Sequence, residues 1–394
     1  MDGSESRYRA WLDARAASGL LRELQSAEHD ARGHVSYGGK SYVNFSSNDY
    51  LGLSQHPALV ERARAWTEQY GAGAGASRLV TGNLHMFDEV ERKVAKLKNS
   101  PAAVVMASGF QANAAVLQAL FDKQVLTREP IVFADRLNHA SMHFGCQAAG
   151  VRQHRYRHCD VEHLATLLAK HGKDSGPKFI LTESVFSMDG DVAPMQALAA
   201  LARVFNAMLI CDDAHATGIL GAGGEGLSGA ADVVIGTFSK AMGSYGAYIA
   251  CSESLRDYLV NRCSGLIYST ALPPPVLGAI DASIELVPGL DAERAHVRAL
   301  AGRFREGARS LGYDTGASST QIVPLIVGAT QDALGLSARL KDAGCWVAAI
   351  RPPTVPQGTA RLRLAFTAAH LSAQVDALLD VLSGSLGHAR ASTP

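Results

Sequence analysis

The sequence lacks several features that mark particular classes of protein. No stretch reaches the roughly 18 uncharged apolar residues of a membrane-spanning helix. The N-terminal segment is charged and has no apolar core of the kind that a signal peptide carries. None of the six cysteines forms a CxxC pair, which argues against zinc and disulfides and favours free thiols in a reducing compartment. We therefore expect a cytoplasmic protein with no bound metal.

An excess of either charge is also missing. Lys plus Arg and Asp plus Glu both total 37, so no net field draws the chain to nucleic acid or to an anionic membrane. There is no repeat and no low-complexity linker. A chain of 394 residues, 47% of them hydrophobic, exceeds what one core usually holds, so we expect a globular enzyme with a large and a smaller domain.

The order of apolar runs indicates the fold class. Residues 5–28 read as an amphipathic helix, and residues 34–45 as a strand pair around Gly38-Gly39. Six short apolar runs then alternate with helical stretches, which is typical of a doubly wound, mostly parallel α/β sheet. These runs are Ala103–Ser108, Ile131–Asp135, Phe179–Glu183, Met208–Asp213, Val233–Phe238 and Gly246–Cys251.

The pattern of expected elements changes from about Asp291. A helix over residues 292–311 precedes short strands near 322–327, 346–350 and 361–365, and a last helix follows. This pattern predicts a smaller α+β domain. We expect an N-terminal helix and strand pair in residues 1–45, a large domain in 46–288 and a small C-terminal domain in 289–394.

Polar residues follow five of the predicted strands directly. In open α/β sheets, ligands bind beyond the carboxyl ends of the strands, so five polar endings together predict one site. The endings are Ser108-Gly109-Phe110, Asp135 to His139, Thr182-Glu183-Ser184 with Ser187, Asp212 to His215, and Thr237 to Lys240.

Lys240 is the pivotal residue of this predicted site. A lysine after a strand is usually a solvent-exposed residue with no functional role. This one lies among Thr237, Ser239 and Gly243, whose hydroxyl groups and sterically accessible backbone amides can bind a phosphate. Such a lysine can lose its proton and form a Schiff base with an aldehyde.

Asp212 is the candidate carboxylate partner for the ring nitrogen of a cofactor bound to Lys240. Pyridoxal 5′-phosphate (PLP) withdraws electrons only while its ring nitrogen is protonated, and a buried carboxylate beside that nitrogen keeps it so. A lone Asp in this place is more often a cap or turn residue. Here His215 follows three residues later, placed to bond the cofactor's phenolic oxygen.

Two other segments fit the same reading. Ser108-Gly109-Phe110 precedes a helical stretch whose first amides could hold a phosphate, although Ser108 could equally be an ordinary helix cap. His139 could lie flat on the cofactor ring or be a structural histidine. The GxGxxG match at Gly221–Gly226 does not lie between a strand and a long helix, so we interpret it as a flexible loop, not a nucleotide site.

Long motifs identify a family. The chain resembles the α-oxoamine synthases over nearly its full length, and these have the aspartate-aminotransferase fold, also called PLP-dependent transferase fold type I. The shared motifs are Asn44–Gly52, Ser184–Asp191, Asp212-Asp213-Ala214-His215 and Gly236-Thr237-Phe238-Ser239-Lys240. The tail, Gly344–Pro356 and Gly358–Leu364, is similar to the branch that condenses L-alanine with a pimeloyl thioester in biotin biosynthesis.

The resemblance implies a role for each candidate residue. The catalytic set would be Lys240, His139, Asp212 and His215, with Lys240 carrying PLP, Asp212 pairing with the ring nitrogen and His139 stacking on the ring. The other cofactor contacts would be Gly109, Phe110, Ser187 and Thr237, with Ser269 and Thr270 reaching the phosphate of a partner in a homodimer. The substrate contacts would be Arg22, Asn48, His139, Thr354 and Arg363, and Arg363 would grip the amino-acid carboxylate.

The resemblance also implies the reaction. L-Alanine and a pimeloyl thioester of coenzyme A or of acyl carrier protein would give 8-amino-7-oxononanoate, carbon dioxide and a free thiol. Another α-oxoamine synthase, such as 2-amino-3-ketobutyrate CoA ligase, is the alternative. An inactive scaffold of the same fold would lack the lysine, and Lys240 is present.

Overall fold

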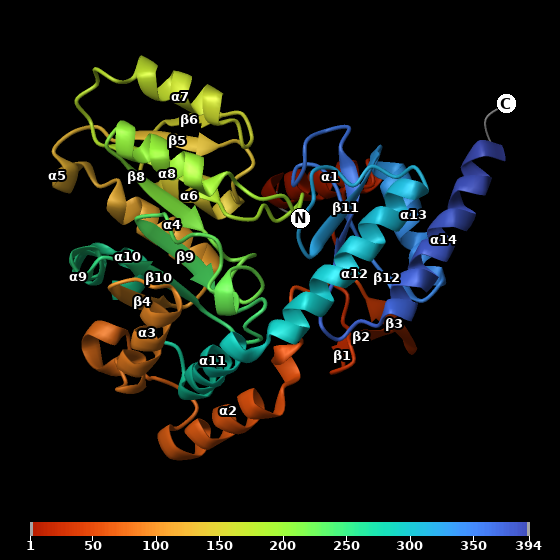
Figure 1. Ribbon diagram of the computed structural model, residues 1–394, viewed down its shortest axis with the longest axis horizontal. Coiled ribbons are helices and arrows are strands. Elements are labelled where there is room, and N and C mark those ends of the chain that lie inside the picture. The colour runs from red at the N-terminus through yellow and green to blue at the C-terminus, as the bar shows by residue number, and fades with distance from the viewer. Residues whose placement is uncertain (1–2, 392–394) are drawn as a thin grey trace. The chain divides into compact units, whose positions relative to one another are not determined.

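The computed structural model describes the backbone of residues 3–391 and the side chains of residues 5–384. The described chain divides into two compact units (Figure 1). The larger unit contains residues 48–187 and 191–295, and the smaller contains residues 3–47, 188–190 and 296–391. The expected boundaries at 45/46 and 288/289 stay a prediction, and residues 1–2 and 392–394 of the expected outer segments lie outside the described residues.

A seven-stranded sheet forms the larger unit. β10 runs antiparallel to both of its neighbours, and every other neighbouring pair is parallel. The expected mostly parallel sheet is thus confirmed. The order across the sheet is β4 (Ala102–Met106), β10 (Ala247–Cys251), β9 (Val233–Thr237), β8 (Ala207–Asp212), β7 (Lys178–Glu183), β5 (Ile131–Asp135) and β6 (Gln153–Tyr156).

Ten α-helices of the larger unit connect or cover these strands. They are α2 (Pro57–Tyr70), α3 (Met86–Leu97), α4 (Gly109–Leu120), α5 (Lys123–Leu126), α6 (Ala140–Ala148), α7 (Val161–Lys170), α8 (Met195–Val204), α9 (Glu253–Arg262), α10 (Ser264–Ile267) and α11 (Pro274–Leu286). Short 3-10 turns lie at Leu53–Gln55, Ala222–Gly224 and Val287–Gly289, and a π-helical turn at Arg78–Gly82.

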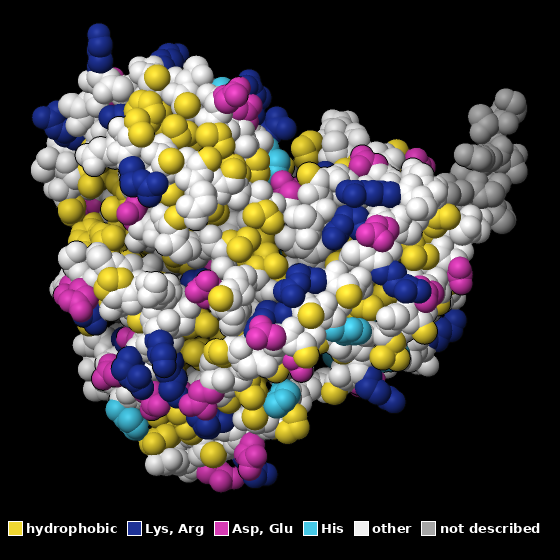
Figure 2. All heavy atoms as spheres, viewed as in Figure 1, with side chains coloured by type: hydrophobic (Ala, Val, Ile, Leu, Met, Phe, Trp, Pro, Cys, Tyr) yellow, Lys and Arg dark blue, Asp and Glu magenta, His cyan; other side chains and the backbone are white. Residues whose placement is uncertain are grey.

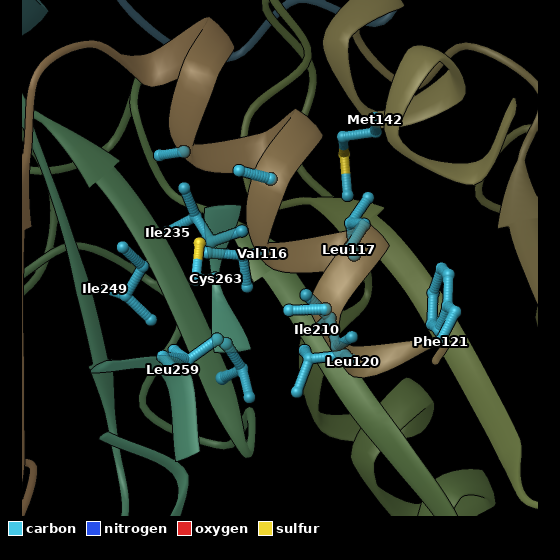
Figure 3. Close-up of a cluster of buried hydrophobic side chains, with 14 of the residues drawn as sticks. Val116, Leu117, Leu120, Phe121, Met142, Ile210, Ile235, Ile249, Leu259 and Cys263 are labelled. Atoms are coloured by element: carbon cyan, nitrogen blue, oxygen red, sulfur yellow. The ribbon is translucent and has the colours of Figure 1, made fainter. Parts of the chain in front are cut away.

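The central strands are apolar throughout because both faces of the sheet are covered. Side chains alternate between the faces along each strand. In β8, Ile210 joins the core under α4, where it meets Val116 and Leu120 of that helix (Figure 3). Leu209 and Cys211 join the opposite core, which includes residues of α7 and α8. This alternation determines toward which face of the sheet the side chain at the end of each strand points.

The smaller unit has two sheets. One contains β1 (Glu28–His29), β2 (His34–Tyr37), β3 (Lys40–Asn44) and β12 (Cys345–Trp346), and the other contains β11 (Ile322–Gly328), β14 (Ala360–Ala365) and β13 (Ala348–Ile350), each in that order. Its helices are α1 (Gly3–Ala17), α12 (Asp291–Ser310, which begins in the larger unit), α13 (Thr330–Asp342) and α14 (Ser372–Ala391). The expected strand pair at 34–45 and the α+β texture after 291 are confirmed.

Two expected elements differ from the structure. The helix expected over residues 5–28 ends at Ala17, because Gly19 adopts a left-handed φ of 65°. The N–H groups of Gly19 and Leu20 then bond back to the carbonyls of Ala16 and Arg15, a Schellman ending that closes the helix. The strand expected near 346–350 is split into β12 and β13, which pair with β3 and β14 respectively.

The surface agrees with the balanced composition. Figure 2 shows basic and acidic side chains interspersed over the visible face, in keeping with equal totals of 37. Within residues 3–391, no helix has both the length and the apolarity needed to cross a bilayer.

Asp213 is a buried centre of hydrogen bonding just past β8. Its carboxylate is fully buried and accepts from Lys98 Nζ at 2.6 Å, Thr217 Oγ1 at 2.9 Å and the Ser184 hydroxyl. The glycine-rich loop approaches closely, since a Cβ at Gly226 would lie 1.8 Å from Asp213 Oδ2. Position 226 therefore requires glycine, because any side chain there would collide with the Asp213 carboxylate.

Replacing Lys98 by Met should destabilise the larger unit strongly. The change leaves the Asp213 carboxylate buried without its cation, and breaking such a pair costs about 3–5 kcal/mol. Lys123→Met, which removes an exposed ion pair with Glu129, is the matched control and should cost about 1 kcal/mol or less. Urea unfolding followed by circular dichroism measures both; equal midpoints for the two variants would contradict the assigned importance of the buried pair.

Candidate active site

The predicted site residues of the larger unit lie at the carboxyl ends of its parallel strands. Glu183 ends β7 and Asp212 ends β8, and the two are direct register partners on neighbouring strands. Because side chains alternate along a strand, both point to the face that α4 covers, as Leu181 and Ile210 do two residues earlier. Two buried carboxylates therefore lie side by side.

The Asp212 carboxylate is held by two hydrogen bonds. Asn113 on α4 donates its Nδ2 to Asp212 Oδ2 at 2.7 Å, and the backbone N–H of Ala214 donates to Oδ1 at 2.9 Å. Asp212 and Asn113 are both more than nine-tenths buried. Asn113 was not among the predicted site residues, since nothing in the helical stretch at 112–120 distinguished the face on which it lies.

His139 caps the N-terminus of α6. Its Nδ1 accepts from the backbone N–H of Ser141 at 3.3 Å and lies 2.7 Å from the Ser141 hydroxyl oxygen. Partial burial lowers the pKa of His139; the charge of Asp212 opposes this effect and that of Lys240 adds to it, and the net shift is downward. The lowered pKa of His139 favours its neutral imidazole.

Glu183 belongs to one of the five predicted polar strand endings, but the sequence assigned it no role of its own. Burial first, and the neighbouring charge of Asp212 second, raise the pKa of Glu183 well above its usual range. Lys240 and the backbone N–H groups of His139 and Ser187 act in the other direction without outweighing these effects. Burial and the nearby carboxylate of Asp212 thus favour the protonated form of Glu183.

Lys240 and the start of α4 form the other side of the site. Lys240 is half-buried just past β9, and its charge acts on both His139 and Glu183. Thr237 at the end of β9 is close to Gly109, where an added Cβ would lie 3.8 Å from the Thr237 Cβ. Ser108 caps α4 by accepting from the Gln111 N–H, which confirms the cap reading, and the phosphate-binding reading of Ser108-Gly109-Phe110 stays a prediction.

His215 is linked to Asn48 through a residue that the sequence reading did not single out. Tyr50 donates its hydroxyl hydrogen to Asn48 Oδ1 at 3.1 Å, and its oxygen lies 2.7 Å from His215 Nδ1. Tyr50 thus joins Asn48 and the ring of His215 through its one hydroxyl group. This arrangement orients the ring of His215.

The remaining cofactor candidates lie in the same unit. Ser187 is buried, in the loop after β7. Phe110 is half exposed and packs against Phe144 with ring centroids 5.6 Å apart. The Ser269 hydroxyl accepts from Gln111 Nε2 at 2.6 Å, and Thr270 forms an isolated bridge with Ser77.

Three predicted substrate contacts belong to the smaller unit. Arg22 donates to the hydroxyl of Thr354 at 3.0 Å, so these two are brought together. Arg361 and Arg363 are both buried on β14, and Arg361 forms an ion pair with Asp189. Arg361 is thus engaged in an ion pair, and the carboxylate role of Arg363 stays a prediction.

One cluster among the described residues resembles a metal site. Asp135, His158 and Cys159 lie close together, but both ring nitrogens of His158 are already engaged, by Asp135 at 3.0 Å and Asp191 at 2.7 Å. Burial lowers the pKa of His158, but these two bonds outweigh it and raise the pKa to about 12. We interpret the cluster as a structural imidazolium between two carboxylates.

The chemistry of these groups fits PLP. A lysine, a buried carboxylate fixed by two donors, and a helix N-terminus beside a threonine are suited to an aldehyde, a ring nitrogen and a phosphate respectively. The smaller unit, taken by itself, has the buried arginines Arg361 and Arg363, and arginine binds carboxylates well because its donors form a planar fork.

Comparisons with known proteins agree with this assignment. The model of the family "Aminotransferase class I and II" matches residues 40–382. A relative from Gluconacetobacter diazotrophicus, named 8-amino-7-oxononanoate synthase, is 56% identical over 368 residues, 92% of each chain.

Two solved structures are also similar. Serine palmitoyltransferase from S. paucimobilis, determined with a bound PLP-myriocin aldimine, is 26% identical with a TM-score of 0.90 and 98% coverage of both chains. The 8-amino-7-oxononanoate synthase of Francisella tularensis is 26% identical with a TM-score of 0.76, covering 89% of this chain and 99% of that one. The chain belongs to the aminotransferase class I and II family and, within it, to the 8-amino-7-oxononanoate synthases.

Proposed function

We propose that the chain catalyses the PLP-dependent, decarboxylative condensation of L-alanine with a pimeloyl thioester, which forms 8-amino-7-oxononanoate for biotin biosynthesis. The observation that carries the proposal is the 56% identity to a relative of that name over 92% of both chains. The lysine, aspartate and histidines that this chemistry requires lie at the carboxyl edge of one sheet. Six free cysteines support a cytoplasmic location.

The residues of the larger unit would divide the catalytic work. PLP, when bound, supplies an electron-withdrawing ring that makes the alpha proton of the amino acid removable. Lys240 Nζ would hold the cofactor and then take and return that proton. Asp212, fixed by Asn113 and Ala214, would hold a proton on the ring nitrogen, and His215 and Ser187 would bond the phenolic oxygen.

The other residues would bind and orient. Gly109, Phe110 and Thr237 would hold the phosphate, and His139 would stack on the ring and contact the substrate. Arg363 would bind the alanine carboxylate with Asn48 nearby, and the Arg22–Thr354 pair would contact the acyl substrate.

A homodimer with shared sites is part of the proposal. Ser269 and Thr270 would reach the partner's phosphate. Large apolar side chains beside them support such an interface, because Tyr268 and Val80 are 83% and 74% exposed, and the Ser77–Thr270 bridge joins their two segments.

Incubation of the purified protein with L-alanine and pimeloyl-CoA should give 8-amino-7-oxononanoate, detected by mass spectrometry. Glycine with acetyl-CoA is the control pair, because it is the combination that the ligase alternative would use. Faster turnover of glycine and acetyl-CoA than of alanine and pimeloyl-CoA would replace the proposed substrates by those of the ligase.

Borohydride reduction should fix the cofactor to Lys240 as a stable secondary amine. The reason is that Lys240 lies just past β9 and its charge acts on His139 and Glu183. Peptide mapping by mass spectrometry locates the added mass, and Lys240→Ala should abolish it. Recovery of the cofactor on a different lysine would overturn the assignment.

Replacing Arg363 by Lys should weaken alanine binding by about 1–3 kcal/mol, because the charge remains but the planar two-donor fork is lost. Titration with alanine, followed by the absorbance of the bound cofactor, measures the change. Arg361→Lys is the matched control: it alters the ion pair with Asp189 and should leave alanine affinity nearly unchanged. The opposite ranking of the two variants would show that Arg361 binds the carboxylate.

A further inference from the structure

We infer that Asn113 and Ser141 are positioning residues that form a directed hydrogen-bond relay between Asp212 and His139, and that this relay keeps the proton of His139 on Nε2. The inference rests on the proposed function only for the roles of Asp212 and His139. The relay itself consists of contacts within the larger unit.

Three contacts make the relay continuous. Asn113 Nδ2 is 2.7 Å from Asp212 Oδ2 and 3.0 Å from Ser141 Oγ, and Ser141 Oγ is 2.7 Å from His139 Nδ1. The relay thus joins the end of β8 to the N-terminus of α6 through one residue of α4. Asn113 and Ser141 are 2% and 0% exposed, so water does not compete for the two bonds of Asn113, while His139 at the end of the relay is exposed.

The chemistry of the groups fixes the direction of each bond. Both acceptors next to Asn113, a carboxylate oxygen and a hydroxyl oxygen, require the NH₂ side of the amide; the flipped amide would place Oδ1 against the carboxylate. Ser141 Oγ accepts from Asn113, so its own hydrogen is directed to His139 Nδ1. The Ser141 backbone N–H also donates to this nitrogen, which therefore carries no proton.

Neutral His139 then has its proton on Nε2. That nitrogen becomes a donor toward the site, while the relay occupies Nδ1. A hydrogen bond to the bare Nδ1 stabilises the neutral imidazole, so it holds the pKa of His139 down. The charged groups facing His139 are Asp212 and Lys240, its backbone N–H faces Glu183, and His143 lies one turn further along α6.

The test reads the state of His139 itself. Full-length protein with ¹⁵N-labelled histidine is titrated by NMR, with His139 assigned from its absence in His139→Asn. The ring should show the Nε2–H tautomer. Ser141→Ala should raise the pKa of His139 by about 0.5–1 unit, since one hydrogen bond to the neutral form is lost.

Asn113→Leu adds the decisive comparison. It should raise the pKa of His139 by a few tenths of a unit or more when Ser141 is present, and should have no further effect in the Ser141→Ala background. Such non-additivity is expected if Asn113 acts through Ser141, whereas independent packing effects add. Ser283→Ala is the matched control, because the Ser283 hydroxyl is buried without a hydrogen-bond partner among the described residues.

Two outcomes overturn the inference: an Nδ1–H tautomer in the parent protein, or additive shifts in the double variant. If Asn113→Leu does not fold, Asn113→Ala replaces it in the same cycle, and Ser141→Ala alone still tests the tautomer. The NMR measurement needs no turnover. Loss of the relay is therefore distinguishable from failure of the proposed reaction, which the product and Lys240 experiments detect.

Discussion

Two adjacent carboxylates at the end of β8 impose the main constraint on the larger unit. Asp212 and Asp213 are both buried and bond to different partners, so each needs its own compensation in a region that excludes water. Asp213 is satisfied permanently by Lys98, Thr217 and Ser184, which also fixes the glycine-rich loop. The hydrogen bonds to Asp212 from Asn113 and Ala214 come from neutral donors, so they orient its carboxylate without cancelling its charge.

The ionisable side chains of Glu183 and His139, near Asp212, favour their uncharged forms. In these forms Glu183 adds no second negative charge, and His139 adds no positive charge. Burial and the charge of Asp212 raise the pKa of Glu183, its neighbour across the strands, because a second buried negative charge is costly. Burial and the charge of Lys240 lower the pKa of His139, which disfavours its cation. A cationic ligand ring would thus meet one carboxylate with a defined orientation, which is the preorganisation that catalysis in a low-dielectric site requires.

Much of this site could be predicted from the sequence, because the ends of strands are visible in it. Lys240, Asp212 and His215 follow apolar runs directly, and parallel strands bring such endings to one edge. Asn113 and Ser141 could not be found in this way, since their partners depend on how α4 and α6 are rotated against the sheet. Tyr50 lay within a recognised motif, but its contact with His215 joins positions 165 apart. Gly19 did indicate that α1 ends early. The leucines that follow it continue a helical spacing of apolar residues, and for this reason the helix was predicted to be longer.

The order of strands in the larger sheet also affects how the chain must be made. β4 is an edge strand with β10 as its neighbour in the sheet, although β4 ends at Met106 and β10 begins at Ala247. During synthesis, this apolar strand emerges from the ribosome long before its partner exists. At about 5–20 residues per second, it waits on the order of ten seconds with its hydrogen-bonding groups unpaired. The interval is one in which a growing chain of this fold depends on chaperones, or on provisional contacts of its own, to avoid pairing with another chain.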